Sequence, residues 1–300
     1  MYSKILVALD GSKTAETVLP FARCFARSLQ IPVELLAIVD VAEMARHVTA
    51  DQASMVRTLI DDQTRRLENY LKSAVKNFPA GTAHDTVQKG NAAEAIIESA
   101  AVDKQALIAM ATHGRSGLDR WLLGSVAEKV LRGTSNPLLL VRATDQAPLW
   151  DMPTLKRVIV PLDGSRLAES VLPSVEVLAQ NLDLEVILMG VYGGPFSSDG
   201  EGFFNTSHAE AFLAELRAEM VTYLTTKTEE MKQRGVVKVS CTAKEGRAAD
   251  EIISLARKTP DNLVAMCTHG RSGVKRWMLG SVTERVVRHS GDPVLVVRAS

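Results

Sequence analysis

The chain has 300 residues, of which 46% are hydrophobic and 23% charged; this excludes a disordered chain and suffices for one large or two ordinary globular domains. Its 35 basic side chains balance 35 acidic ones, so no overall charge attracts nucleic acid or an anionic membrane, and any bound anion must be captured locally. The 3 cysteines have no C-x-x-C spacing, which argues against a disulfide framework and against a zinc site.

The expected elements alternate between strands and helices along the whole chain. In the first half we expect strands at 4–9, 33–39, 84–88, 106–111 and 137–142, and helices near 13–29, 52–78, 92–101 and 125–132. In the second half we expect strands at 157–162, 184–191, 236–243, 262–267 and 293–298, with helices between them. Continuous apolar strands are typical of sheets covered on both faces, and β-α alternation indicates parallel pairing.

The fold class expected from this pattern is α/β, with two tandem Rossmann-like, doubly wound domains. Each domain is expected to hold a five-stranded, mainly parallel sheet, and its ligands should bind beyond the carboxyl ends of the strands. The N-terminus has only a short apolar run, Ile5 to Leu9, which is too brief for a signal peptide, and no uncharged run approaches the roughly 18 residues that span a bilayer. We therefore expect a cytoplasmic protein.

The two halves repeat one another. Residues 112–128, THGRSGLDRWLLGSVAE, and residues 268–284, THGRSGVKRWMLGSVTE, agree at 13 of 17 positions, and the openings 4–12 and 157–165 correspond as well. The spacing is 153 residues early and 156 late, which we attribute to one insertion in the Gly/Ser-rich stretch 193–202. The predicted domains are residues 1–143 and 156–300, joined by a linker at 144–155.

A glycine-rich turn follows the fourth strand of each repeat. Thr112 to Gly117 comes directly after this strand in the first repeat, and Gly124-Ser125 then opens a helix. Glycine permits positive φ and close approach of a ligand, and the amides at a helix start favour phosphate, so we expect amides near residues 114, 124, 270 and 280 to converge on one anion. No lysine follows, so the turn is not a Walker A loop.

Plain architecture is the alternative interpretation of the same residues. Ser125-Val-Ala-Glu128 and Ser281-Val-Thr-Glu284 have the spacing of a capping box, in which serine and glutamate satisfy the amides that would otherwise bind the anion. The sequence leaves both interpretations open.

The order of motifs resembles the universal stress protein family, over essentially the whole chain and in both repeats. The motifs are a DGS turn after the first strand, the helix entries Gly90-Asn-Ala-Ala-Glu-Ala-Ile96 and Gly246-Arg-Ala-Ala-Asp-Glu-Ile252, the M-x-T-H-G-R-S-G turn, L-G-S-V, and a P-x-L-x-V-R ending. The resemblance implies a sheet like that of the adenine nucleotide alpha hydrolases and a tandem two-domain arrangement.

The resemblance also implies an ATP site, built around G-x-x-G, nine residues, then G-S/T. Both repeats lack the first glycine, which is replaced by Ala111 and Cys267, and because a thiol would crowd the ligand more than a methyl group we expect the first repeat to bind better. The residues carried over by position are Leu9, Asp10, Ile38, Met110, Ala111, His113, Gly114, Gly124, Ser125 and Val126, and then Leu162, Asp163, Val191, Met266, Cys267, His269, Gly270, Gly280, Ser281 and Val282.

Several of these residues have a simpler alternative role. Asp10 and Asp163 would face the adenosine, with Ile38 and Val191 flanking the adenine, but Asp-Gly-Ser before a helix also forms a turn by local hydrogen bonding. His113 and His269 either contact phosphate or serve the backbone turn. Cys267 is either a redox sensor or a small buried filler.

The leading hypothesis for function is binding of ATP or a related adenine nucleotide, with Mg²⁺ arriving with the nucleotide, in stress response or signalling. We expect no catalytic residues and no metal site of the protein's own; a nucleotide-independent interaction scaffold and a slow ATP hydrolase are the alternatives. Because the last strand of each repeat is apolar and would otherwise be an unpaired edge, we expect the two domains to form an intrachain pseudo-dimer, with a homodimer also possible.

Overall fold

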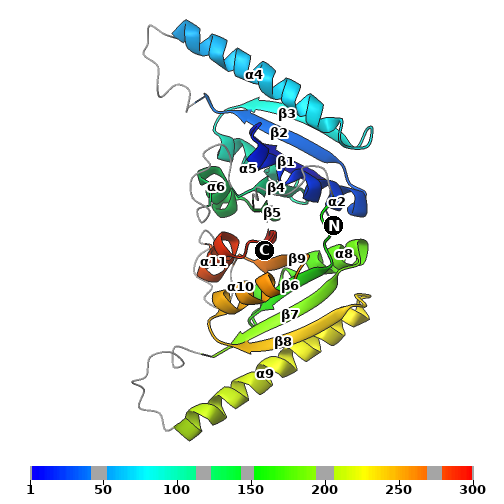
Figure 1. Cartoon of the computed structure of the whole chain (residues 1–300), viewed down its shortest axis with the longest axis vertical. Helices are drawn as coiled ribbons and strands as arrows, with labels where there is room; N and C mark the ends of the chain where they lie inside the picture. Colours follow the sequence, from blue (N-terminus) through cyan, green and yellow to red (C-terminus); the bar gives the residue numbers. More distant parts are fainter. Residues whose placement is uncertain are drawn as a thin grey trace. The chain divides into compact units, whose positions relative to one another are not determined.

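The computed structural model describes residues 2–41, 53–112, 123–142, 152–193, 206–268 and 279–298. The chain divides into two compact units, Met1–Pro153 and Thr154–Ser300 (domains 1 and 2), and the division falls inside the stretch 144–155 assigned above to the linker. Figure 1 shows the elements of each unit in their sequence colours. The ends of the domains at single-residue precision stay a prediction.

Domain 1 is a five-stranded parallel sheet in the order β3-β2-β1-β4-β5. Its elements are β1 (Ile5–Leu9), α1 (Lys13–Glu16), α2 (Leu19–Leu29), β2 (Val33–Val39), α4 (Ala53–Val75), β3 (Ala83–Lys89), α5 (Ala92–Ala101), β4 (Leu107–Ala111), α6 (Ser125–Gly133) and β5 (Leu138–Val141).

Domain 2 repeats this topology in the order β8-β7-β6-β9-β10, again with parallel pairing throughout. Its elements are β6 (Arg157–Leu162), α7 (Arg166–Glu169), α8 (Leu172–Leu182), β7 (Glu185–Tyr192), α9 (Thr206–Gln233), β8 (Val239–Glu245), α10 (Ala248–Lys258), β9 (Asn262–Cys267), α11 (Ser281–His289) and β10 (Val294–Val297). The predicted fold class, two Rossmann-like domains with five-stranded parallel sheets, is confirmed.

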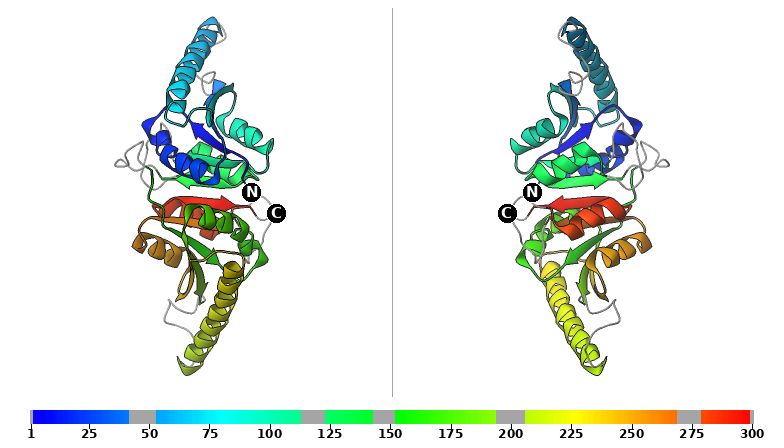
Figure 2. Two further views of the ribbon diagram at one scale, coloured as in Figure 1. Left: turned by 90° about the vertical axis from the view of Figure 1, so that its right-hand side faces the viewer. Right: turned by 90° about the vertical axis from the view of Figure 1, so that its left-hand side faces the viewer.

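Helices lie on both faces of each sheet because right-handed crossovers place them there. In domain 1, α2 and α5 lie on opposite sides of the sheet (Figure 2). The central strands β1 and β4 are therefore buried along their whole length. The chain leaves β1 toward β2 and leaves β4 toward β5, so the strand order reverses between β1 and β4, and a crevice for ligands is expected beyond their carboxyl ends.

Two details of the expected elements are wrong. The helix expected over 13–29 is two helices, α1 and α2, because Pro20 lies in the first turn of α2 and has no amide to continue a helix from α1. The same break separates α7 from α8 in domain 2.

The insertion expected in the stretch 193–202 is also wrong. Tyr70 on α4 and Tyr223 on α9 are 153 residues apart, and each lies beside the glutamate of its own short helix, Glu16 or Glu169. The strands that follow, β3 and β8, begin at residues 83 and 239, a spacing of 156. The three extra residues therefore lie between Tyr223 and β8, where α9 continues to Gln233, whereas α4 ends at Val75, closer to its tyrosine. About one added helical turn accounts for them.

Candidate functional site

The DGS turns that follow β1 and β6 are held by their own aspartates. Asp10 Oδ1 accepts from the amide and hydroxyl of Ser12 at 2.9 and 2.6 Å, and Ser12 Oγ accepts from the amide of Ala15 at 3.1 Å, which caps α1. Asp163 and Ser165 form the same turn at 3.0, 2.6 and 3.1 Å. The turn-forming role of both aspartates is confirmed, while their contact with adenosine stays a prediction.

The glycine turns are described only at their two ends. His113, Gly114, His269 and Gly270 lie outside the described residues. Gly124 precedes α6 with φ −59° and ψ 146°, and Gly280 precedes α11 with φ −63° and ψ 138°. These angles suit any residue, so positive φ is not the reason for glycine at either position.

The amides of these two glycines do not face a ligand. The amide of Gly124 donates to the carbonyl of Thr112 at 2.7 Å, and that of Gly280 donates to the carbonyl of Thr268 at 2.8 Å. The expectation that the amides at 124 and 280 bind the anion is therefore wrong, because these bonds close the turn on the end of the preceding strand.

The capping boxes expected at α6 and α11 do not form. Gly124 is the N-cap of α6 and has no side chain, so Ser125 is the first helical residue and lies one position too late to cap. Glu128 contacts Arg132 instead, with Nε donating to Oε1 at 3.2 Å, and Glu284 contacts Arg288 in the same way at 3.2 Å. The capping box, on which the architectural alternative was based, is therefore wrong in both domains, although the bonds of the Gly124 and Gly280 amides are architectural.

Within the described residues, the first two amides of α6 and of α11 consequently have no hydrogen-bond partner. No hydrogen bond joins the amide of Ser125 or Val126 to the part of the chain that the structure describes, and the same holds for Ser281 and Val282. By contrast, Ser12 caps α1 and Asn91 caps α5 through their side chains. Both uncapped helices follow the strand at which the sheet order reverses.

The residues at the carboxyl ends of the strands that precede these turns are mostly apolar, and they are buried. Leu9, Met110 and Ala111 are buried in domain 1, and Leu162 and Met266 are buried in domain 2. Cys267, also buried, accepts a hydrogen bond from Ser170 Oγ at 3.3 Å, so its thiol is turned toward the end of α7. The thiol is thus a packed, hydrogen-bonded side chain, as expected of a filler. The expected order of affinity of the two domains stays a prediction.

Each sheet has an open backbone edge where the adenine is expected. Pairing of β6 with β7 ends at Leu162 and Gly190, but β7 continues to Tyr192. Successive residues of a strand in a parallel sheet bond alternately to either side, and the carbonyl of Tyr192 accepts from Gly246 on the β8 side at 3.0 Å. The C=O of Val191 therefore points to the side that β6 has left, beyond the last pair of this ladder, whereas its N–H still belongs to that pair.

Domain 1 has the same arrangement at Ile38. Pairing of β1 with β2 ends at Leu9 and Ala37, and β2 continues to Val39, whose carbonyl accepts from Gly90 at 3.1 Å. Ile38 and Val191 are thus equivalent, and each offers one backbone acceptor, its C=O, at the crevice.

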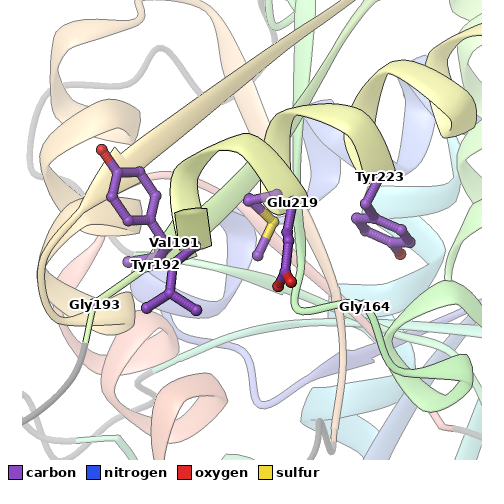
Figure 3. Close-up of a pocket in the computed structure, with 8 residues that line it drawn as sticks. Gly164, Val191, Tyr192, Gly193, Glu219 and Tyr223 are labelled. Carbon is purple, nitrogen blue, oxygen red and sulfur yellow. The ribbon is translucent and has the colours of Figure 1, made fainter. Parts of the chain in front are cut away.

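Domain 2 has a pocket beside this open edge. Its volume is about 330 Å³, near the lower end of the range for small-molecule sites. It lies between the DGS turn, the end of β7 and the long helix α9 (Figure 3). Its lining residues are Gly164, Val191, Tyr192, Gly193, Leu216, Glu219, Met220 and Tyr223.

The four lining residues on α9 were missed by the sequence reasoning. The sequence does contain a signal for Tyr223. It lies 153 residues after Tyr70, and Glu169 lies 153 residues after Glu16, so the same acid and tyrosine occur at equivalent positions in the two repeats. Equal spacing of an acid and a tyrosine in both repeats predicts that the two meet.

A polar cluster on α7 and α9 adjoins the pocket. The hydroxyl of Tyr223 donates to Glu169 Oε1 at 2.9 Å, and Lys227 Nζ lies 3.2 Å from Glu169 Oε2 and 3.0 Å from Glu230 Oε2. Burial, followed by the hydrogen bond and charge of Glu169, raises the pKa of Tyr223, so its hydroxyl keeps its proton. Burial opposes the charge on Lys227, but its bonds to Glu230 and Glu169 outweigh burial and raise its pKa.

Domain 1 keeps only part of this cluster. Burial and the neighbouring Glu16 raise the pKa of Tyr70, yet its buried hydroxyl has no partner at ordinary hydrogen-bond geometry within the described residues. Ala74 takes the place of Lys227, 153 residues earlier. Within the described ranges, no group of three His, Cys, Asp or Glu residues could hold a metal ion, and no helix is long and apolar enough to cross a membrane.

Comparison with known proteins gives consistent results. The sequence profile of the universal stress protein family matches residues 1–142 and again residues 154–298. Universal stress protein MJ0531 of Methanocaldococcus jannaschii is 32% identical over 145 residues, which cover 48% of this chain and 82% of that protein. A universal stress protein of Mycolicibacterium smegmatis is 22% identical over 300 residues, with 98% of this chain and 96% of the relative covered.

Solved structures agree on the fold. The crystal structure of a universal stress protein from Archaeoglobus fulgidus is 20% identical to this chain and has a TM-score of 0.71. The match covers 99% of this chain and 98% of that one, so both domains have counterparts in one relative.

Proposed function

We propose that this chain, which belongs to the universal stress protein family, binds an adenine nucleotide at the strand tips of its domains. The ligand is ATP or a close relative, with Mg²⁺ arriving on its phosphates. The protein acts in stress response or signalling and has little or no catalytic activity.

The uncapped first turns of α6 and α11 carry this proposal. Both helices begin at a glycine without a side chain to cap them, and the amides of Ser125, Val126, Ser281 and Val282 have no partner within the described residues. Such amides carry partial positive charge and favour a phosphate group. Because the molecule has no net charge, this local field is what would select an anion.

The open edge at Val191 and Ile38 would take the base. The backbone C=O of each of these residues matches the 6-amino donor of adenine. The base would lie at the β7 or β2 end of the crevice and the phosphates at the α11 or α6 end, since the order β7-β6-β9 places these ends on either side of β6.

Substitution of the N-cap glycines tests the proposal. Aspartate at an N-cap accepts from the first-turn amides and stabilises a helix, so Gly124→Asp and Gly280→Asp should leave the fold intact while replacing the anion with a carboxylate. We expect each substitution to remove one ATP-binding event from the full chain in calorimetry with ATP and Mg²⁺. Gly124→Ala is the matched control, because alanine neither caps nor adds charge.

The results also separate the alternatives. No binding heat for the unmodified chain would overturn the proposal and favour an interaction scaffold, which the internal bonds of the Gly124 and Gly280 amides already support in part. ATP turnover that disappears in the double aspartate variant would instead identify a slow hydrolase. The intrachain pairing of the domains, a homodimer and a cytoplasmic location stay predictions, for sedimentation and cell fractionation to test.

A further inference from the structure

The domain 2 pocket contains a carboxylate without a partner. Glu219 is exposed on α9, and no hydrogen bond or ion pair joins it to a described residue. Its carboxylate points away from the α9 backbone, toward the space between Val191 and Gly164 (Figure 3). The next residue, Met220, is buried against the sheet, so the helix holds Glu219 at the rim of the pocket.

The other polar side chains of the pocket do not compete for this carboxylate. Tyr223 gives its proton to Glu169, so toward the pocket its oxygen can only accept. The hydroxyl of Tyr192 points away from the pocket (Figure 3). Lys227, the nearest cation of the polar cluster, is held by Glu169 and Glu230 and does not line the pocket. The side chains that face the ligand therefore offer acceptors, and a matching ligand must present donors.

We propose that Glu219 determines base specificity in domain 2 by accepting a hydrogen bond from the exocyclic amino group of a 6-aminopurine. This inference rests on the proposed function, in which the base lies against Val191. A 6-amino group has two N–H donors, of which one would reach the carbonyl of Val191 and the other the carboxylate of Glu219. A 6-oxo group would instead place an acceptor against a carboxylate.

The inference is specific to domain 2. The residue of domain 1 that is equivalent to Glu219 is Arg66, which lies 153 positions earlier, on α4. A guanidinium has donors only, so it cannot accept from an amino group. The two domains are thus expected to differ in how strictly they require that group.

A two-ligand, two-variant comparison tests the contact. The full chain carries Gly124→Asp to disable domain 1, and its affinity is measured for ATP and for purine riboside triphosphate, which lacks the 6-amino group but keeps N1. With Glu219 present we expect ATP to bind the more tightly of the two. In Glu219→Ala this preference should fall about tenfold, which is the size of one hydrogen bond to a charged group.

Controls separate this inference from the proposed function. Glu215→Gln, one turn earlier on α9 and exposed, should keep the full preference for ATP. An unchanged preference in Glu219→Ala, with ATP still bound, would overturn the role of Glu219 alone. Failure of the starting protein to bind ATP would overturn the proposed function and this inference together.

Discussion

A single methyl group added at Gly190 would test how the pocket of domain 2 is built. Gly190 lies in β7 opposite the last paired residue of β6, and Met220 packs directly against its backbone. A Cβ at Gly190 would overlap the Met220 sulfur and lie 2.5 Å from Met220 Cγ and 3.1 Å from Leu224 Cδ1. Because Leu224 is fully buried, the flexible Met220 side chain must move, and we expect it to move toward the pocket that it lines.

The expected cost of Gly190→Ala follows from two opposing terms. Overpacking a core typically costs about 1–3 kcal/mol. Replacing glycine in a strand returns about 0.5–1 kcal/mol of backbone entropy. The midpoints of the two terms leave a net loss of about 1 kcal/mol in the free energy of unfolding, measured by urea denaturation. We expect this loss together with weaker ATP binding in domain 2.

Domain 1 supplies the matched rescue. The equivalent positions there are Ala37 and Leu67, a pair that already accommodates the methyl group. Adding Met220→Leu to Gly190→Ala recreates this pair and should restore at least half of the lost stability. The reasoning is refuted if Gly190→Ala unfolds at the same urea concentration as the unmodified chain, or if the second substitution lowers stability further.

Two further predictions concern single polar groups. Burial raises the pKa of Asp292 from 3.8 to about 6; the native state then holds the proton more tightly than the unfolded state, so stability falls as the pH rises through this interval. Since the carboxyl is partly exposed, we expect Asp292→Asn to stabilise domain 2 by only about 1 kcal/mol above pH 6.5 and to have little effect near pH 4, in calorimetry across that range. Tyr223→Phe removes the bond to Glu169 and should cost about 1 kcal/mol, whereas Tyr70→Phe removes a hydroxyl without a described partner and should cost nothing or stabilise; equal losses in urea denaturation would contradict this contrast.

Strand periodicity and the repeat predicted the fold because both depend on local patterns. Continuous apolar runs such as 107–111 can be buried only in a sheet covered on both faces, and the structure has these strands within two residues of the expected ends, except at the start of β8. That strand was expected from 236 and begins at Val239, because the added turn of α9 displaces it. A three-residue change of spacing reveals that an insertion exists but not which element absorbs it.

The site was predicted less completely, for reasons of geometry. A Ser-x-x-Glu string predicts a capping box only if serine is the N-cap, and here the helix begins one residue earlier than that pattern requires. That one-residue shift decides whether the first-turn amides are satisfied, and the string alone does not contain it. The pocket residues of α9 were missed because they lie on a helix distant in sequence from the glycine turn, and only packing brings the two ends of the crevice together.

The differences between the repeats are informative about which end of the crevice selects the ligand. Both domains have a DGS turn, an N-cap glycine and an open strand end. The hydrogen bonds of the two DGS turns agree in length to within 0.1 Å. The long helices differ in sequence. Arg66, Leu67 and Ala74 of α4 occupy the positions that are equivalent to Glu219, Met220 and Lys227 of α9. Phosphate is common to every nucleotide, so under the proposed function we expect the two domains to share the phosphate contacts and to differ in their specificity for the base.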